Sequence, residues 1–512
     1  MNSTRIGPPA SSAARTGAMT ISYRLQPQPI LQSALAWLKA PPAGDPLHDL
    51  AALRQYLKEA AEAMIQPVQR LKLLELLQAR SDSTSVILRP RLLDATLPLP
   101  HRLRTIAQGL LDVRGLLATA QLNSLHQLDS DSAAITEEDI STSCAHVLAN
   151  LAEQQQIALI VSTTVPNGLW LQAQDTFRLL EKANGGQTGA GRDSLKIMLA
   201  LVAAQPEAFT AREVSFLIEY LRQFSPAVEL GNQPVPPLER WYWLEQSRDL
   251  PPVAIARRQP PSQGSLLYFS CATLGKIASQ HLIQLANGRS PEELRLPANT
   301  IDENREVLVR AQQRWASVPR RHSHRRPSHY RVEICARIQT LWNMLRGGEP
   351  AKVSRDATPI TDWMVLNESP SGFALMHVAG TIEDMAPGDA LGLRTAPGRP
   401  WNIGLIRWAR SDNPEHFELG LEMISPTAIP VEVVQPLAEG SRRCPALLFP
   451  AVSGLDRSET LMTRRGQLCP GTFMLIRETD NRLQVTQCQM HHLVLQTSKI
   501  EIFEFRRNFS AE

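Results

Sequence analysis

The spacing of hydrophobic residues changes near residue 330, and this change constrains the fold more than any other feature of the chain. Between residues 330 and 342, apolar and polar side chains alternate, which is typical of a half-buried β-strand. Further strand-like segments follow at 362–366, 373–378, 390–395, 403–410 and 417–424, separated by turn signals such as Pro387-Gly388-Asp389. Six short strands within about 100 residues predict a small antiparallel β-barrel, because closure removes exposed sheet edges.

The strand-like spacing continues after this barrel. We interpret residues 315–436 as the barrel domain and residues 437–512 as a β-rich C-terminal module. Candidate strands in the module are 447–452, 472–477, 483–486, 493–497 and 500–505. The sequence leaves open whether the module is a second barrel or an extension of the first. Residues 346–359, which are polar and contain two glycines and two prolines, are expected to form a loop or an insertion.

The N-terminal half of the chain carries helical signals instead. Asp45 followed by Pro46 predicts a helix start, and Thr136-x-x-Asp139 and Thr210-x-x-Glu213 have the form of capping boxes. Helices are expected at 68–78, 101–120, 195–203, 216–224 and 302–315, and another is expected to start at 290–293. We therefore predict a helical domain over residues 29–248 and a mixed α-β linker over 249–314, giving a multidomain α+β protein.

Residues 1–28 are rich in Ser, Ala, Pro and Gly and contain no acidic residue, so a disordered tail is expected. Organelle transit peptides share this bias, and the sequence alone leaves that alternative open. No apolar run approaches the ~20 residues of a membrane span.

Composition and motifs argue against several other functions. The net charge of +3 gives no global field of the kind that attracts nucleic acid or membranes. The six cysteines are scattered without a C-x-x-C pair, as expected for reduced thiols of a cytoplasmic protein. Cys488 with His491 and His492 lacks a second ligand cluster, so we expect a structural role and neither a metal nor a cofactor. No catalytic motif is present, and we expect a protein that is not an enzyme.

The strongest local feature of the sequence is a cluster of basic residues. Between Arg314 and Arg346 there are eight arginines and a single acid, Glu333. An R-x-x-x-R pattern occurs at Arg321 and Arg325, flanked by Arg320 and Arg326, just before the first predicted barrel strand. A planar guanidinium binds phosphate oxygens in a bidentate way and stacks on purine rings.

A second pattern, N-x-S-x-x-G, follows at Asn367, Ser369 and Gly372. An amide and a hydroxyl suit the polar edge of guanine, and glycine allows a positive φ and a close approach to the backbone. Together the two patterns suit a compact, multiply phosphorylated guanine ligand better than a long polymer.

This arrangement resembles the PilZ domain family of bacterial cyclic di-GMP receptors, in which R-x-x-x-R precedes a six-stranded barrel and D/N-x-S-x-x-G lies on an early strand. The resemblance covers residues 315–430 and includes the later segments 388–389, 406–408 and 419–422. It implies that Arg320, Arg321, Arg325, Arg326, Asn367, Ser369 and Gly372 bind cyclic di-GMP. It also implies an effector that passes the second messenger to a protein partner in pilus, motility or polysaccharide machinery, with the helical domain as the docking surface.

Two alternatives stay open at this point. The barrel could be a degenerate member of the family within a nucleotide-independent scaffold. The arginine cluster could also contact RNA or anionic lipid, although no aromatic residues are interleaved with it. Trp315, just before the arginine run, is expected either to cover a ligand or to pack at the end of a helix.

Overall fold

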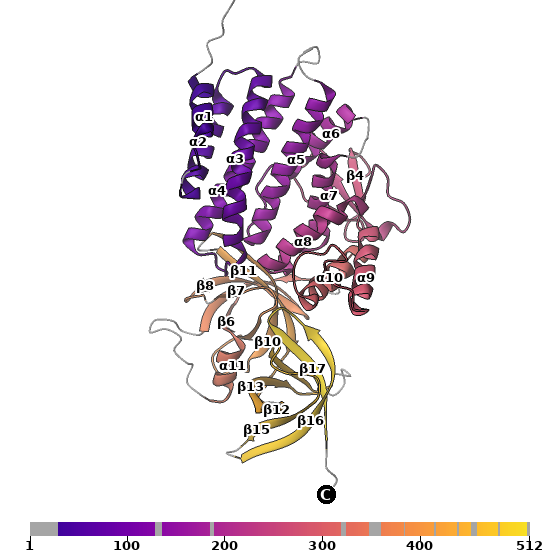
Figure 1. Ribbon diagram of the computed structural model, residues 1–512. Coiled ribbons are helices and arrows are strands. Elements are labelled where there is room, and N and C mark those ends of the chain that lie inside the picture. The colour runs from indigo at the N-terminus through magenta and orange to yellow at the C-terminus, as the bar shows by residue number, and fades with distance from the viewer. Residues whose placement is uncertain are drawn as a thin grey trace, which may run out of the picture.

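The computed structural model describes residues 29–42, 44–128, 136–184, 189–318, 324–347, 360–382, 384–413, 416–437, 440–451, 458–479 and 482–508. The predicted tail and the predicted insertion fall largely outside these ranges, as do Arg320 and Arg321. Figure 1 shows a helical body, then a first barrel, then a second barrel along the length of the molecule.

Eight α-helices build most of the N-terminal body: α1 (Pro29–Lys39), α2 (Pro46–Glu62), α3 (Pro67–Leu93), α4 (His101–His126), α5 (Glu137–Ile160), α6 (Leu169–Asn184), α7 (Ala190–Ala203) and α8 (Ala211–Phe224). The predicted starts of α2, α5 and α8 are confirmed. The side chain of Asp45 accepts from the Leu47 amide, and Thr136 and Thr210 each form a complete capping box. The longest helices extend well beyond the predicted segments 68–78 and 101–120, because buried polar residues interrupt their apolar pattern.

One of these buried polar residues is an arginine at the centre of the body. Arg114 of α4 is 2% exposed, and its guanidinium donates to Asp82 of α3 at 2.6 Å and contacts Glu153 of α5 at 2.7 Å. It also donates to the side-chain oxygen of Asn150 at 3.0 Å. A buried charge is tolerated only when it is paired in this way, so these contacts fix the relative positions of the three helices.

A four-stranded sheet with two helices completes the body. Its strands are β1 (Glu229–Gly231), β2 (Trp241–Glu245), β3 (Val253–Ala254) and β4 (Leu266–Ser270), in the order β1-β4-β2-β3, and the helices are α9 (Ala272–Ala286) and α10 (Ile301–Ala316). The prediction of α10 is confirmed, but the predicted helix start at 290–293 is wrong. That segment forms turns, and Arg295 takes a positive φ of 54° that ends any helical continuation.

The first barrel consists of β6 (Arg331–Ala336), β7 (Ile360–Ser369), β8 (Gly372–Ala379), β9 (Ala390–Arg394), β10 (Asn402–Asn413) and β11 (His416–Ser425). The order β7-β6-β9-β10-β11-β8 closes through an additional pairing of β7 with β8. A short strand, β5 (Arg326–Pro327), extends the edge of β7 beyond β6. The predicted six-stranded antiparallel barrel is therefore confirmed.

One predicted strand is wrong in its second half. Residues 338–342 belong to a helix, α11 (Ile338–Leu345), and not to a continuation of β6. Arg337 takes a φ of 68°, which turns the chain out of the sheet. Ile338, Leu341 and Trp342 then share a helical face, and they pack in a cluster between the two barrels.

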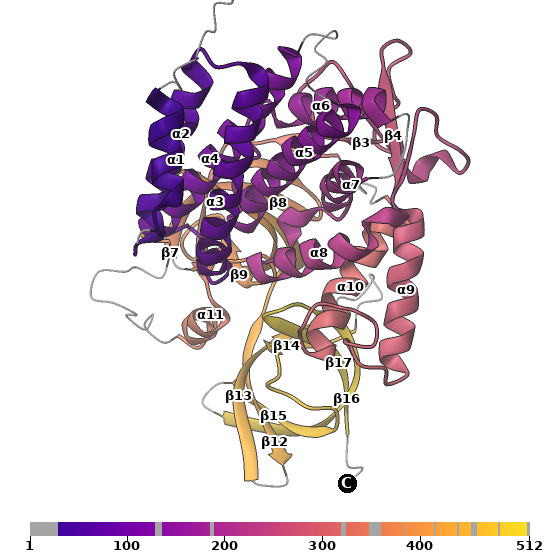
Figure 2. The same ribbon diagram turned by 45° about the horizontal axis from the view of Figure 1, so that its top comes forward.

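The C-terminal module is a second closed barrel. It comprises β12 (Ile429–Leu437), β13 (Gly440–Phe449), β14 (Thr460–Arg464), β15 (Thr472–Thr479), β16 (Arg482–Gln496) and β17 (Ile500–Arg507). Figure 2 looks into its ring of strands. Two predicted strands, 483–486 and 493–497, are parts of the single strand β16, whose pairing with β17 shifts register near His492 and Leu495.

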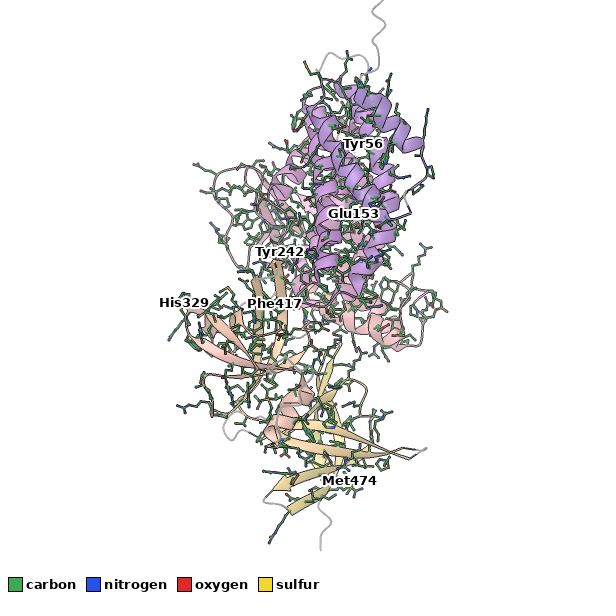
Figure 3. All side chains as sticks on the ribbon, turned by 90° about the vertical axis from the view of Figure 1, so that its left-hand side faces the viewer. Tyr56, Glu153, Tyr242, His329, Phe417 and Met474 are labelled. Carbon is green, nitrogen blue, oxygen red and sulfur yellow. The ribbon has the colours of Figure 1, made fainter. Side chains whose placement is uncertain are left out.

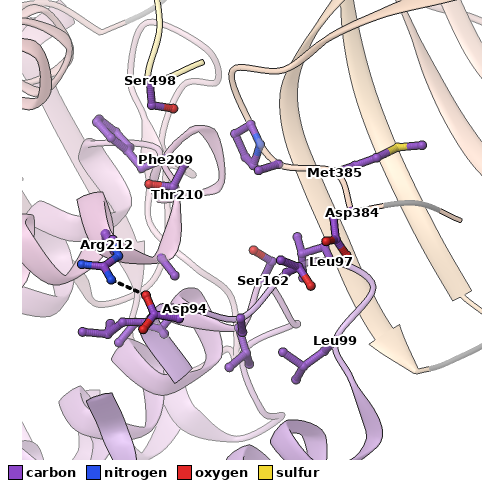
Figure 4. A pocket seen from close by; sticks show the side chains of 18 of the residues that line it. Asp94, Leu97, Leu99, Ser162, Phe209, Thr210, Arg212, Asp384, Met385 and Ser498 are labelled. Carbon is purple, nitrogen blue, oxygen red and sulfur yellow. Dashed lines mark hydrogen bonds and ion pairs between the residues drawn. The ribbon is translucent and has the colours of Figure 1, made fainter. Parts of the chain in front are cut away.

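The helical body and the first barrel share a junction. Leu97, from the connection between α3 and α4, is buried in the core cluster of the first barrel and pairs with Met385 through a backbone bridge. Figure 4 shows the cavity of about 350 Å³ beside this bridge, where the helical body meets both barrels and Asp94 pairs with Arg212. The barrel core is thus completed by a side chain of the helical body.

A second contact at this junction centres on Asp412 of β10. Its carboxylate accepts from the Thr164 amide at 2.7 Å and from the hydroxyls of Thr163 and Thr164 at 3.1 Å and 3.0 Å. Next to it, the Ser411 amide donates to the Ser162 carbonyl at 2.9 Å. The turn after α5 is therefore held by the barrel.

We expect Asp412→Ala to loosen this turn, because three donors lose a charged acceptor. Amide exchange at residues 162–164 should become about tenfold faster, equivalent to about 1.4 kcal/mol. Hydrogen exchange with mass spectrometry measures this change. Asp412→Asn, which keeps an acceptor oxygen, is the control and should show a smaller effect; equal protection in wild type and Asp412→Ala would contradict the role of this carboxylate.

Candidate functional site

The two sequence patterns meet on the β7–β8 hairpin. Ser369 faces Gly372 at the end of the hairpin, and Asn367 faces Ala374, after a register shift that follows Val365. On the other edge of β7, strand β5 places Arg326 opposite Glu368 and Pro327 opposite Asn367. Arg326, Asn367, Ser369 and Gly372 therefore gather at one end of the first barrel.

The segment that carries the last arginines is attached to β7 by its backbone. The Ser328 amide donates to the Leu366 carbonyl at 3.2 Å, and the Val365 amide donates to the Tyr330 carbonyl at 2.9 Å. His329, labelled in Figure 3, lies on this side of the barrel. The attachment positions Arg325 and Arg326, both exposed, beside the motif.

Glu368 is a functional candidate that the sequence reasoning missed. Its carboxylate accepts from the Ser328 hydroxyl at 3.0 Å and from the Tyr330 hydroxyl at 2.7 Å. It occupies a variable position of the N-x-S-x-x-G pattern, so the pattern gave it no weight. The signal that could have found it is the pair Ser328 and Tyr330, two hydroxyls that an extended segment presents on one face.

These hydrogen bonds shift the pKa values of Glu368 and Tyr330. The hydroxyls of Tyr330 and Ser328 lower the pKa of the Glu368 carboxyl, because they stabilise its charged form. Burial, together with the hydrogen bond to Glu368, raises the pKa of Tyr330 to about 12. The pair is therefore most stable with Glu368 ionised and Tyr330 protonated.

This coupling predicts a pH-dependent effect of Glu368→Gln. The pKa of Glu368 in the folded protein lies below its value of about 4.3 in the unfolded chain. The stabilising contribution of the ionised carboxylate is therefore fully present above about pH 4.3, and it is lost as the pH falls through the folded pKa. Above about pH 4.3, the variant should therefore lower the free energy of opening of residues 325–330 relative to wild type, and the difference should shrink in acid.

Native-state hydrogen exchange, corrected for the intrinsic rate at each pH, measures this free energy. Glu239→Gln, at an exposed position in the turn Leu238–Arg240 that precedes β2, is the control. A difference between wild type and Glu368→Gln that stays constant from about pH 3 to about pH 7 would contradict the assignment. Tyr330 contributes in the opposite direction, since its raised pKa makes its stabilising effect disappear as the pH rises from about 10 towards 12.

Asn367 is the most informative residue of the site. Its side-chain oxygen Oδ1 is buried and accepts no hydrogen bond from any of the residues that the structure describes. A buried acceptor without a donor costs about 1–3 kcal/mol, and such atoms in folded proteins call for an explanation. A bound ligand with an N–H donor would satisfy this oxygen.

Ser369 and Gly372 have different roles in the hairpin. The Ser369 hydroxyl lies 3.3 Å from the Gly372 carbonyl and 3.4 Å from the Ser371 hydroxyl, and these long bonds leave it able to turn to a ligand. Gly372 does not take a positive φ; a Cβ at this position would lie 2.0 Å from the Leu421 carbonyl oxygen of β11. The expectation that this glycine serves a positive φ is wrong, because the close approach of two strands requires it instead.

The tryptophans near the motifs take packing roles. Trp315 is 3% exposed, and its indole N–H donates to the Ala200 carbonyl at 3.0 Å inside the helical body, so it does not cover a ligand. Trp401 is buried under the guanidinium of Arg394, 4.4 Å from the ring centroid. Trp408 is half-buried and lies against Gly420, where a Cβ would come within 1.8 Å of its Nε1.

In this arrangement the guanidinium groups can bind phosphate. The amide and the hydroxyl can form hydrogen bonds with the edge of a base. Arg320 and Arg321 lie outside the described residues. The other predicted site residues, Arg325, Arg326, Asn367, Ser369 and Gly372, lie together at one end of the first barrel. Across the part of the chain that the structure describes, no group of three or more His, Cys, Asp or Glu side chains is gathered in a way that could hold a metal ion. Within the same residues, no helix combines the length and hydropathy required to cross a bilayer.

Comparison with known proteins identifies the family of the first barrel. Residues 346–430 match the family described as the middle PilZ domain of the cyclic-di-GMP receptor FimW, and residues 32–236 match its N-terminal domain. The cyclic-di-GMP receptor FimW of Pseudomonas aeruginosa (strain PAO1) is 21% identical over 514 residues, covering 84% of this chain and 83% of that protein. The matched PilZ region contains Asn367, Ser369 and Gly372 but not the arginine run.

Proposed function

Residues 346–430 form a PilZ domain, and from that premise we propose that this protein is a cytoplasmic bacterial effector that binds cyclic di-GMP and relays its level to a protein partner. The observation that carries the proposal is the unsatisfied Oδ1 of Asn367, one strand away from Arg326. The similarity to a cyclic-di-GMP receptor along both the helical body and the barrel supports it.

In this proposal the arginines and the hairpin recognise different parts of the ligand. Arg320, Arg321, Arg325 and Arg326 bind the phosphates and stack on the guanine rings, because a guanidinium is planar and always charged. Asn367 and Ser369 bind a guanine edge, with Oδ1 of Asn367 accepting from a base N–H. Gly372 holds the hairpin against β11, which keeps Ser369 in place.

Binding alone is the proposed activity, and no catalysis is assigned. The signal would pass from the arginine segment to the barrel and then to the helical body through Leu97 and Asp412. A ligand shifts such an arrangement only if it favours one position of the barrel over another. The helical body would present the docking surface for the partner, and pilus, motility or polysaccharide machinery are the partners in keeping with the family.

Calorimetric titration of the full-length protein with cyclic di-GMP, with GTP as the control nucleotide, tests the proposal. Saturable heat with cyclic di-GMP, little heat with GTP, and a much weaker response in Asn367→Ala are the expected results. The fitted stoichiometry distinguishes one ligand molecule from an intercalated dimer. Absence of heat with cyclic di-GMP at high concentration would overturn receptor function and leave a nucleotide-independent scaffold.

A further inference from the structure

The outer face of the second barrel carries exposed apolar side chains. In β12, β15 and β16, the side chains of Val433, Phe473 and Cys488 are buried in the core of the barrel. Successive residues of a strand point to opposite faces, so residues an odd number of positions away from these three point outward. On β16 the outward residues include Leu483, which is 70% exposed, and Val485, which is 54% exposed.

The strand pairing joins these residues to others on the neighbouring strands. Val434 of β12 pairs with Met474 of β15, and Ile476 of β15 pairs with Val485 of β16. Paired residues lie on the same face of a sheet, with their Cβ atoms about 5 Å apart. The outward apolar side chains therefore form one continuous stripe across three strands, which we call the outer stripe: Val434, Met474, Ile476, Val485 and Leu483.

The outer stripe lies away from the other domains. Figure 3 labels Met474 at the opposite end of the molecule from Tyr56 of the helical body. Contiguous apolar patches on the surface of a folded protein commonly mark interaction sites. The position and the exposure of the outer stripe leave it accessible to another molecule.

Charged residues of opposite sign lie at the two ends of the outer stripe. At one end, Arg443 of β13 pairs with Val434. At the other end, Glu478 of β15 pairs with Leu483. A partner that covers the stripe therefore meets a guanidinium at one end and a carboxylate at the other.

Both charged residues also have a partner within the chain. Arg443 contacts Glu432 of β12, and Glu478 contacts Arg346, which follows α11. The side chains of Arg443 and Glu478 are 67% and 46% exposed, whereas those of Glu432 and Arg346 are 18% and 37% exposed. The more exposed member of each ion pair is thus the one at the end of the stripe.

This distribution of charge favours a second copy of the chain as the partner. Two arginines and two glutamates leave the face neutral, so it does not attract nucleic acid, an anionic membrane or a strongly charged protein. A surface with opposite charges at its two ends is complementary to a copy of itself that is turned end to end.

A groove beside the stripe fits this arrangement. A cavity of about 350 Å³ is lined by Ile476 and Glu478 and by Trp342 of α11. A two-fold axis that lies in the interface and passes between Met474 and Ile476 brings Arg443 of the second copy to this groove. Its guanidinium would then face the carboxylate of Glu478.

We propose that the outer stripe is the contact surface between two copies of this chain. The apolar side chains pack against those of the second copy, and Arg443 of each copy faces Glu478 of the other. Five side chains on three strands make a small interface, so the dimer is weak, with a dissociation constant on the order of 10–100 µM. The contact uses none of the candidate cyclic di-GMP residues, so its failure and the failure of the proposed function are separate results.

Sedimentation velocity of the full-length protein from about 2 to about 200 µM tests the proposal, because the dimer fraction follows mass action. Val485→Lys should raise the dissociation constant of the dimer about tenfold or more, since it places a charge within the apolar contact. Val494→Lys is the matched control. Val494 is 51% exposed on the same strand, beyond the part of β16 that pairs with β15, and its variant should dimerise as wild type does.

A charge-exchange experiment identifies the partner as a second copy. Arg443→Glu alone places two glutamates opposite each other at both end contacts, and Glu478→Arg alone places two arginines there, so each variant should remain monomeric where wild type dimerises. In an equimolar mixture of the two variants, both end contacts join opposite charges again, and dimers should return. A protein that stays monomeric at about 200 µM, equal dimerisation of Val485→Lys and Val494→Lys, or a mixture that remains monomeric would each overturn the proposal.

Discussion

Arg325→Ala is expected to weaken cyclic di-GMP binding by about 100-fold or more, a loss of about 2.7 kcal/mol. A phosphate held by a guanidinium makes two parallel charge-assisted hydrogen bonds, and alanine replaces neither. Arg325 directly precedes β5, whose pairing with β7 brings the segment beside Asn367. Arg321→Ala, at the other arginine of the pattern, should have a similar effect. Calorimetric titration of each full-length variant gives the dissociation constants.

Arg331→Ala is the matched control for this experiment. Arg331 is an exposed arginine at the start of β6, outside both sequence patterns, and its removal changes the net charge by the same amount. It should bind cyclic di-GMP within about threefold of wild type, since Arg331 lies opposite Met364 and not opposite a motif residue, and an exposed charge is screened by salt. If Arg325→Ala also binds within that range, the arginine assignment is wrong even if the protein is a receptor.

Gly372→Ala is expected to destabilise the first barrel by about 3 kcal/mol or more. The added Cβ would lie 2.0 Å from the Leu421 carbonyl oxygen, so strands β8 and β11 must separate locally. The obstructing atom belongs to the backbone and cannot turn away as a flexible side chain would. Amide exchange in β8 and β11 should accelerate by about two orders of magnitude, as measured by hydrogen exchange with mass spectrometry.

Gly404→Ala tests whether this effect is steric. Gly404 lies in β10 of the same barrel, has no positive φ, and would place its Cβ no closer than 3.6 Å to a neighbouring atom. Its exchange rates should stay close to those of wild type. Wild-type exchange in Gly372→Ala, combined with lost nucleotide binding, would instead mean that the glycine serves the ligand directly.

The fold was largely predictable where side-chain periodicity and local capping agree. The capping boxes at Thr136 and Thr210 form as predicted, because both partners lie within four residues of each other. The six strands of the first barrel follow from alternation and turn signals. The alternation continues through Trp342, however, although the chain leaves the sheet at Arg337, whose positive φ starts α11. A positive φ cannot be predicted from the presence of an arginine.

Other elements depend on partners distant in the sequence. β12 contains Pro430 and Pro436, which argue against a strand, yet β13 and β15 pair with it and close the second barrel. For the site, the motif named Asn367 and Ser369 but gave no sign of Glu368, whose importance arises only when Ser328 and Tyr330 are brought opposite it. Pairing across strands, unlike capping, cannot be read from a single segment.

The position of Leu97 has a consequence for how the protein is made. This side chain belongs to the helical body, but it is buried with Trp363, Leu375 and Phe417 inside the first barrel. During synthesis the helices leave the ribosome before any strand of the barrel. Leu97 is therefore exposed to solvent until the barrel strands are made and pack around it. A PilZ domain expressed without the preceding helices would close over a vacant position in its core. We therefore expect truncation at the domain boundary to destabilise the first barrel, because the truncated domain lacks the side chain of Leu97 in its core.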